Sequence, residues 1–159
     1  MTDPVLKKAD IDAMPGTDKT HFLNDGARRV NRSLGDAVGL TGFGIHHITV
    51  PPGKQSTEYH VHHAEDECAY VLSGTGTVTI GTAEHPIGPG DFIGYCKGGD
   101  AHTMTNTGDE PLVCIVVGER LAHDVVDYPR RGKRLYRHAG LPWNLVDHDA
   151  IEEPSAGAK

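Results

Sequence analysis

The feature that most constrains the fold of this chain is a regular succession of turn signals between Gly42 and about residue 118. Short apolar or β-branched runs alternate there with glycine, proline and aspartate turns, about 6 to 12 residues apart. Thr77 to Ile80 alternates in this way before Gly81-Thr82, and Pro89-Gly90-Asp91 precedes another short run. This spacing is typical of short antiparallel strands, so the sequence predicts an all-β fold, a sandwich or a barrel.

The predicted strands follow one another closely in this central region. They cover Phe43–Val50, Glu58–His63, Cys68–Leu72, Thr77–Ile80, Phe92–Tyr95, Ala101–Asn106 and Leu112–Val117. The chain before them is harder to interpret: residues 7–14 suit a short helix or an extended arm, and residues 28–35 alternate weakly, as an edge strand does. We therefore expect an arm over residues 1–41 that packs on the barrel or on a partner subunit, a barrel core over 42–120, and an extension over 121–159 with a frayed end.

Composition narrows the class of protein further. A length of 159 residues suits one domain, and 20 glycines with 10 prolines favour turns over long helices. The net charge of −7 argues against nucleic acid as a partner. The three cysteines lack the spacing of a disulfide framework, and neither a signal-peptide core nor an apolar run of about 20 residues is present. We expect a cytoplasmic protein with no membrane partner.

The residues with the clearest chemistry lie between Tyr59 and Cys68. Side chains alternate along a strand, so His60 and His62 project to the same side and His63 to the other. Three acids follow at positions 65–67, and Glu67 is favoured because it stands at the start of the next apolar run. Two imidazoles and a carboxylate suit a metal if a fourth ligand exists, and His102, after a glycine-rich turn, is a candidate.

These residues fall into two motifs, His60-x-His62-x4-Glu67-x6-Gly74 and Gly99-x2-His102-x3-Asn106. They closely resemble the two conserved motifs of the cupin superfamily, and the resemblance covers roughly residues 42–118. It implies a double-stranded β-helix, or jelly-roll β-barrel, in which His60, His62, Glu67 and His102 bind one divalent transition metal. Imidazole-rich sites suit Fe, Mn, Ni or Zn to different degrees, so the identity of the metal stays open. The resemblance also implies a homodimer built partly from the N-terminal arm.

Strand alternation suggests further residues around the metal. Glu58 shares the face of His60 and His62, and is either a catalytic general base or half of a structural salt bridge. Met104 and Asn106 share the face of His102, and Tyr95 is a further candidate for the pocket. His46 and His47 are adjacent and face opposite ways, so one of them either lines the barrel interior or is a buried histidine satisfied by hydrogen bonds, which is the favoured role.

The segment Arg130–Arg137 is strongly basic. It either contacts an anionic ligand or another subunit, or it is a solvated strand on an acidic protein.

Three functions remain compatible with the sequence. A metal-dependent enzyme acting on a small oxygenated molecule is favoured, as a dioxygenase, a sugar or sugar-phosphate isomerase, or a lyase, because all four ligands are present. The alternatives are a non-catalytic small-molecule or metal-binding module and a structural barrel. Rossmann, P-loop, serine-elbow and zinc-finger motifs are all missing from the sequence.

Overall fold

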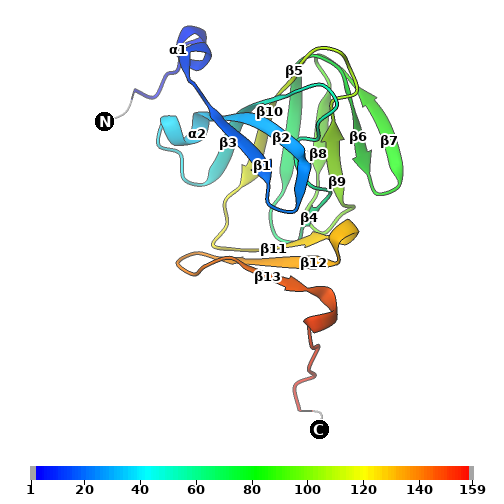
Figure 1. The fold of residues 1–159 in the computed structure, drawn as a ribbon. Coiled ribbons are helices and arrows are strands. Elements are labelled where there is room, and N and C mark those ends of the chain that lie inside the picture. Colours follow the sequence, from blue (N-terminus) through cyan, green and yellow to red (C-terminus); the bar gives the residue numbers. More distant parts are fainter. Residues whose placement is uncertain (1–2, 158–159) are drawn as a thin grey trace.

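The computed structural model describes residues 3–157 and consists mainly of antiparallel strands (Figure 1), which confirms the all-β prediction. Its helices are short. The elements, in chain order, are α1 (Lys8–Ala13), β1 (Thr17–His21), β2 (Asn24–Ser33), α2 (Leu34–Ala37), β3 (Phe43–Val50), β4 (Val61–His62), β5 (Glu67–Ser73), β6 (Gly76–Ile80), β7 (Ala83–Ile87), β8 (Phe92–Tyr95), β9 (His102–Thr105), β10 (Leu112–Glu119), β11 (His123–Tyr128), β12 (Lys133–His138) and β13 (Asn144–Asp147), with 3₁₀ turns at Pro129–Arg131 and His148–Ala150.

Two sheets enclose the main core. The larger has the strand order β1-β2-β3-β10-β5-β8, and the smaller has the order β7-β6-β9. Side chains of both sheets meet in one apolar cluster that includes Val71 and Leu112 from the first and Val78 and Met104 from the second. Burying a side chain such as Val71 contributes roughly 1.5–3 kcal/mol, so this cluster is the principal force that holds the two layers together.

Alternation along β5 shows how the sequence selects the inner face. Ala69 and Val71 are fully buried, whereas Tyr70 and Leu72 between and after them are exposed on the outer face. A strand presents successive side chains to opposite sides, so this alternation fixes which residues reach the interior. The same rule turns Glu67, two residues before Ala69, toward the inside of the barrel.

The turn between β5 and β6 requires glycine at position 74. Gly74 has a φ of +77°, a conformation that other residues rarely adopt. A Cβ atom at this position would also lie 2.3 Å from the carbonyl oxygen of Pro111. The turn therefore lets the chain pass closely by the start of β10.

The N-terminal segment adds two strands to the larger sheet. β1 and β2 form an antiparallel hairpin that turns at Phe22-Leu23 and continues the sheet beyond β3 (Figure 1). The expectation of an edge strand over residues 28–35 is wrong, because β1 occupies the edge and β2 is paired on both sides. Several side chains of this hairpin thereby line a cavity of the protein.

The C-terminal segment contributes β11, β12 and β13 to a four-stranded sheet below the barrel, in the order β13-β12-β11-β4, whose fourth strand comes from the central region (Figure 1). Its apolar side chains Val126, Tyr128 and Leu135 cluster with Leu23 of the N-terminal hairpin. Most of the basic side chains after Pro129 pair with acids of the same chain: Arg131 with Glu58, Lys133 with Asp147, Arg134 with Asp127, and Arg137 with Glu65 and Asp124. No helix among residues 3–157 has the length and apolar character needed to cross a membrane.

Candidate metal centre

The strand pairing of the barrel brings the two predicted motifs together. His60 lies just before β4, and His102 begins β9. Each of these two residues donates its backbone N–H to the carbonyl oxygen of the other, at 3.1 Å from His60 and 2.8 Å from His102. The backbone of one motif is therefore hydrogen-bonded to that of the other, and their side chains start from a fixed separation.

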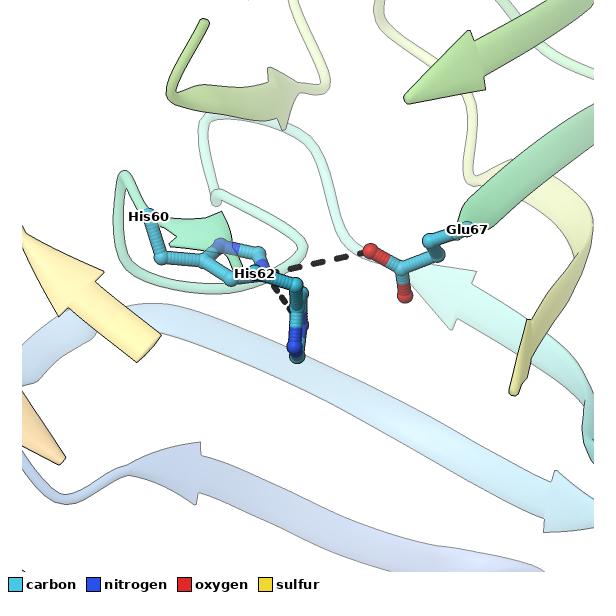
Figure 2. Close-up of side chains that lie close together, drawn as sticks. All are labelled: His60, His62 and Glu67. Atoms are coloured by element: carbon cyan, nitrogen blue, oxygen red, sulfur yellow. Dashed lines mark hydrogen bonds and ion pairs between the residues drawn. The ribbon is translucent and has the colours of Figure 1, made fainter. Parts of the chain in front are cut away.

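Three of the predicted ligands converge closely (Figure 2). Nε2 of His60 lies 3.2 Å from Nε2 of His62 and 3.8 Å from Oε2 of Glu67, and one donor atom from each residue lies within 4.8 Å of the others. His102 is outside that tight group of three, but its Nε2 lies 3.3 Å from Oε2 of Glu67. All four residues line one side of a common space.

Hydrogen bonds to the far nitrogens orient two of the imidazoles. Nδ1 of His60 lies 2.8 Å from the carbonyl oxygen of Glu58, and Nδ1 of His62 lies 2.6 Å from a carboxylate oxygen of Asp124. Both partners only accept hydrogen bonds, so both Nδ1 atoms carry a proton, and in the neutral rings the Nε2 lone pairs face each other. Two facing lone pairs repel unless a proton or a metal ion lies between them, and hydrogen bonds to the far nitrogens are how metal-binding histidines are usually oriented.

The environment also sets the charges of the site. Burial lowers the pKa of His60 to about 3, which keeps this imidazole neutral and able to coordinate. Burial alone would raise the pKa of Glu67, but the hydrogen bond from His102 and the nearby imidazoles outweigh it and lower the pKa to about 2. Burial likewise disfavours charge on His62, yet Asp124 and Glu67 raise its pKa overall. The Glu67 carboxylate is thus ionised at neutral pH.

The donor set fits a divalent transition metal. Donors bound at about 2.1 Å from one ion lie roughly 3 to 3.5 Å apart from their neighbours. The separations of 3.2 and 3.3 Å agree with that range, and the 3.8 Å between His60 and Glu67 lies slightly above it. His102 is the least constrained of the predicted ligands, because its buried Nδ1 has no hydrogen-bond partner within residues 3–157. The ring of Tyr95 stacks on His102 instead, with centroids 3.6 Å apart and planes 5° from parallel.

The donors open onto a cavity of about 380 Å³, a volume suited to a small molecule. Among the predicted pocket residues, Tyr95 and Met104 line it, and His46 is the member of the adjacent histidine pair that does so. Burial raises the pKa of Tyr95 far above its ordinary value, so the phenol stays protonated.

Two other predicted residues lie elsewhere. The Glu58 carboxylate is buried, accepts two hydrogen bonds from Arg131 at 3.0 and 2.8 Å, and is not part of the cavity wall. This matches the salt-bridge alternative and leaves the general-base role without support. Asn106 is fully buried and donates to the carbonyl oxygens of Val50 and Glu110, so its amide stabilises a turn.

Several residues of the site escaped sequence reasoning because they lie outside the two motifs. Asp124 and Arg137 stand behind His62, and the cavity wall is completed by Lys19 and Arg29 from the N-terminal hairpin and Trp143 near the C-terminus. The basic run after Pro129 was the only signal that pointed to any of them.

Comparisons with known proteins agree with this geometry. A model of the cupin domain matches residues 46–118. The chain is similar to a crystal structure from Acidithiobacillus ferrooxidans named "Putative sugar phosphate isomerase", with 55% identity over 95% of this chain and 96% of that chain and a TM-score of 0.91. It is also similar to a crystal structure from Silicibacter pomeroyi named as a sugar phosphate isomerase from a cupin superfamily. The identity is 26% over 92% of this chain and 96% of that chain, and the TM-score is 0.81.

A more distant match concerns the fold alone. A Cupin 2 conserved barrel domain protein from Salinispora arenicola is 23% identical, over 59% of this chain and 77% of that chain, with a TM-score of 0.52. A search of the curated proteins gave no match. The chain belongs to the cupin superfamily, and its sheets form the jelly-roll barrel that the motifs implied.

Proposed function

We propose that this protein is a metal-dependent isomerase that interconverts the aldose and ketose forms of a small sugar phosphate. The observation that carries the proposal is the convergence of His60, His62 and Glu67, with His102 beside them, on one side of a cavity of substrate size. The names of the two similar isomerase structures support the same reaction class. The four predicted ligands are part of the cavity wall, so a substrate bound in the cavity reaches them.

A divalent metal held by the four ligands would supply a Lewis acid for the carbonyl and hydroxyl oxygens of an open-chain sugar. The chain itself must move a proton between neighbouring carbons, which requires a base that faces the cavity. His46 is suited to this role. Burial and the positive charges of Lys19, Arg120 and Arg29 lower its pKa, so the imidazole is neutral, the form that a base requires.

The position of His46 agrees with the role. In the larger sheet, β3 lies between β2, which carries Arg29, and the β10–β5 pair, which carries Glu67. The amide nitrogen of Asn31 lies 3.2 Å from Nδ1 of His46 and donates to it, which orients the ring and leaves its proton on Nε2. As a base, His46 would accept the substrate proton at Nδ1, in exchange for the bond to Asn31. His46 therefore stands between the metal ligands and the basic wall of the same cavity.

The remaining wall is suited to holding a sugar. Met104, Val126 and Tyr128 are buried apolar side chains that limit the access of water to the reacting carbons. Phe22 and Trp143 at the rim are exposed, at 56% and 62% of their full surface. Exposed aromatic faces beside a polar cavity are typical of ligand-binding sites, and these can cover the apolar face of a sugar ring.

The proposal is tested by incubating the Fe-, Mn-, Ni- or Zn-loaded protein with a panel of aldose and ketose phosphates in D₂O. We expect interconversion, with solvent deuterium entering at the carbon next to the carbonyl, to be visible by NMR. His60→Ala should abolish it. His63→Asn is the matched control, because His63 is exposed and bonds Asp127 away from the cavity.

Two results would reject the isomerase. Tight binding of sugar phosphates without turnover by any metal form would favour the non-catalytic binding module. Oxygen consumption or loss of a carbon fragment would favour the dioxygenase or lyase class.

A further inference from the structure

A pair of cations on the N-terminal hairpin has no structural explanation of its own. Lys19 on β1 and Arg29 on β2 are direct cross-strand partners, and both line the cavity. Like charges placed directly opposite one another in a sheet repel and destabilise it. In a chain with a net charge of −7, an acidic residue opposite either cation would remove this repulsion. The direct pairing of Lys19 with Arg29 therefore suggests a functional role.

Other arginines of the chain, in contrast to Lys19 and Arg29, form ion pairs with acidic side chains. Arg28 on the outer face of the same strand pairs with Asp18, Arg120 with Asp36, and Arg134 with Asp127. Within residues 3–157, no carboxylate oxygen lies within 4.0 Å of the cationic nitrogens of Lys19 or Arg29. Their positive charges are left facing the cavity.

The Arg29 guanidinium is held in place but not satisfied. One of its Nη atoms donates to the carbonyl oxygen of Ser56, whereas its Nε is buried and has no acceptor among residues 3–157. An arginine anchored on one side presents its other N–H groups as a fixed fork, which suits the oxygens of a phosphate. Burial lowers the pKa of Arg29, whereas the negative charge of Glu67 raises it. The charges of Arg29 and of the predicted metal ligand Glu67 therefore interact through the cavity that both residues line.

We propose that Lys19 and Arg29 form an anion subsite that binds the phosphate group of the substrate. This inference rests on the isomerase proposed above and specifies its substrate as a phosphate monoester, whose charge of about −1.5 to −2 matches two cations. Binding at Lys19 and Arg29 places the opposite end of an extended sugar toward His46 and the metal ligands. The subsite thereby selects phosphorylated over neutral sugars.

Titration of inorganic phosphate by calorimetry tests the subsite without any need for turnover. We expect the wild type to bind phosphate both when it is metal-loaded and after the metal is stripped. The double variant Lys19→Met/Arg29→Met should bind it at least about tenfold more weakly in both forms. Arg28→Met removes the same charge from the outer face of β2 and should leave binding unchanged.

Stability separates this result from simple misfolding. Lys19→Met alone removes one of two repelling charges and should leave the melting temperature equal to or above that of the wild type. Arg29→Met also loses the hydrogen bond to the Ser56 carbonyl oxygen, so a cooperative thermal transition is the criterion that the double variant is folded. Phosphate binding that is unchanged in the double variant, or that disappears when the metal is stripped, overturns the subsite.

The two proposals fail in different ways. If phosphate binds through Lys19 and Arg29 but no sugar phosphate is isomerised, the subsite stands and the isomerase falls. If neutral and phosphorylated sugars are turned over with equal kcat/KM, the isomerase stands and the subsite falls.

Discussion

The imidazole of His62 is fixed by the carboxylate of Asp124, which lies 62 residues later in the chain, through a contact of 2.6 Å between Nδ1 and Oδ2. Asp124 is itself fully buried, accepts a hydrogen bond from the backbone N–H of Ala64, and contacts Arg137 at 3.2 Å. Carboxylates in this position raise the basicity of a metal-binding histidine and hold its ring in place. The C-terminal sheet thus supports the candidate metal site of the barrel.

Replacing Asp124 by Asn should weaken metal binding by about 10- to 100-fold, because an amide supports the Nδ1–H of His62 less strongly than a carboxylate does. Competition with a chromophoric chelator measures the affinity. Asp127→Asn is the matched control, since Asp127 lies on the same strand and bonds His63 rather than His62. Equal metal affinity in the two variants would contradict the role of Asp124.

His46→Gln should lower kcat for sugar phosphate isomerisation by about 10²- to 10⁴-fold, the usual contribution of a positioned general base. Metal content should not change, and KM should change little, because His46 is not a metal ligand in this account. His47→Gln provides the control, since His47 adjoins His46 but is not part of the cavity wall. A variant with wild-type kcat would exclude His46 as the base.

Gly74→Ala should destabilise the fold strongly, and Gly53→Ala measures how much of that loss comes from φ alone. Both glycines have a positive φ, which costs other residues roughly 1–2 kcal/mol. A Cβ at position 53 meets no atom within 4 Å, whereas one at position 74 lies 2.3 Å from the Pro111 carbonyl oxygen. We expect urea unfolding to show a clearly larger loss for Gly74→Ala, and equal losses would show that the close passage is absent.

The half-buried carboxylate of Asp127 makes stability depend on pH in the acid range. Hydrogen bonds from Arg134, and others from His63 and His148, hold the pKa of Asp127 well below its ordinary value. A carboxyl with a depressed pKa in the folded state stabilises the protein above its unfolded pKa of about 4, and this contribution is lost as the pH falls further. The stability difference between wild type and Asp127→Asn should be constant from about pH 5 to 7 and shrink below about pH 4. A pH-independent difference would contradict the ion pair.

Much of the barrel could be predicted because its strands are bounded by turns that local chemistry specifies. The predicted strands Phe43–Val50 and Phe92–Tyr95 coincide with β3 and β8. The strand predicted over 58–63 is reduced to Val61–His62 in β4, although His60 still pairs with His102 through an isolated bridge. Strand alternation was enough to place His60 and His62 on one side, because it depends only on neighbouring residues.

The cavity residues outside the two motifs could not be predicted, because they come together only through long-range strand pairing. Lys19 and Arg29 meet only through the pairing of β1 with β2, and the register of that hairpin is interrupted between Thr20 and His21. Asp124 reaches His62 through a sheet between elements far apart in the chain, which local patterns do not encode.

The homodimer stays a prediction. The N-terminal arm, expected to take part in it, forms β1 and β2, which extend the sheet beyond β3 in the same chain.

The most direct test of the account is the metal content of the purified protein, measured by mass spectrometry after expression in metal-replete medium. We predict close to one transition-metal ion per chain in the wild type and almost none in the His60→Ala/His102→Ala double variant, with circular dichroism showing that the variant remains folded. A folded wild type that carries no metal, or a double variant that retains it, would contradict the metal site on which the proposed isomerase depends.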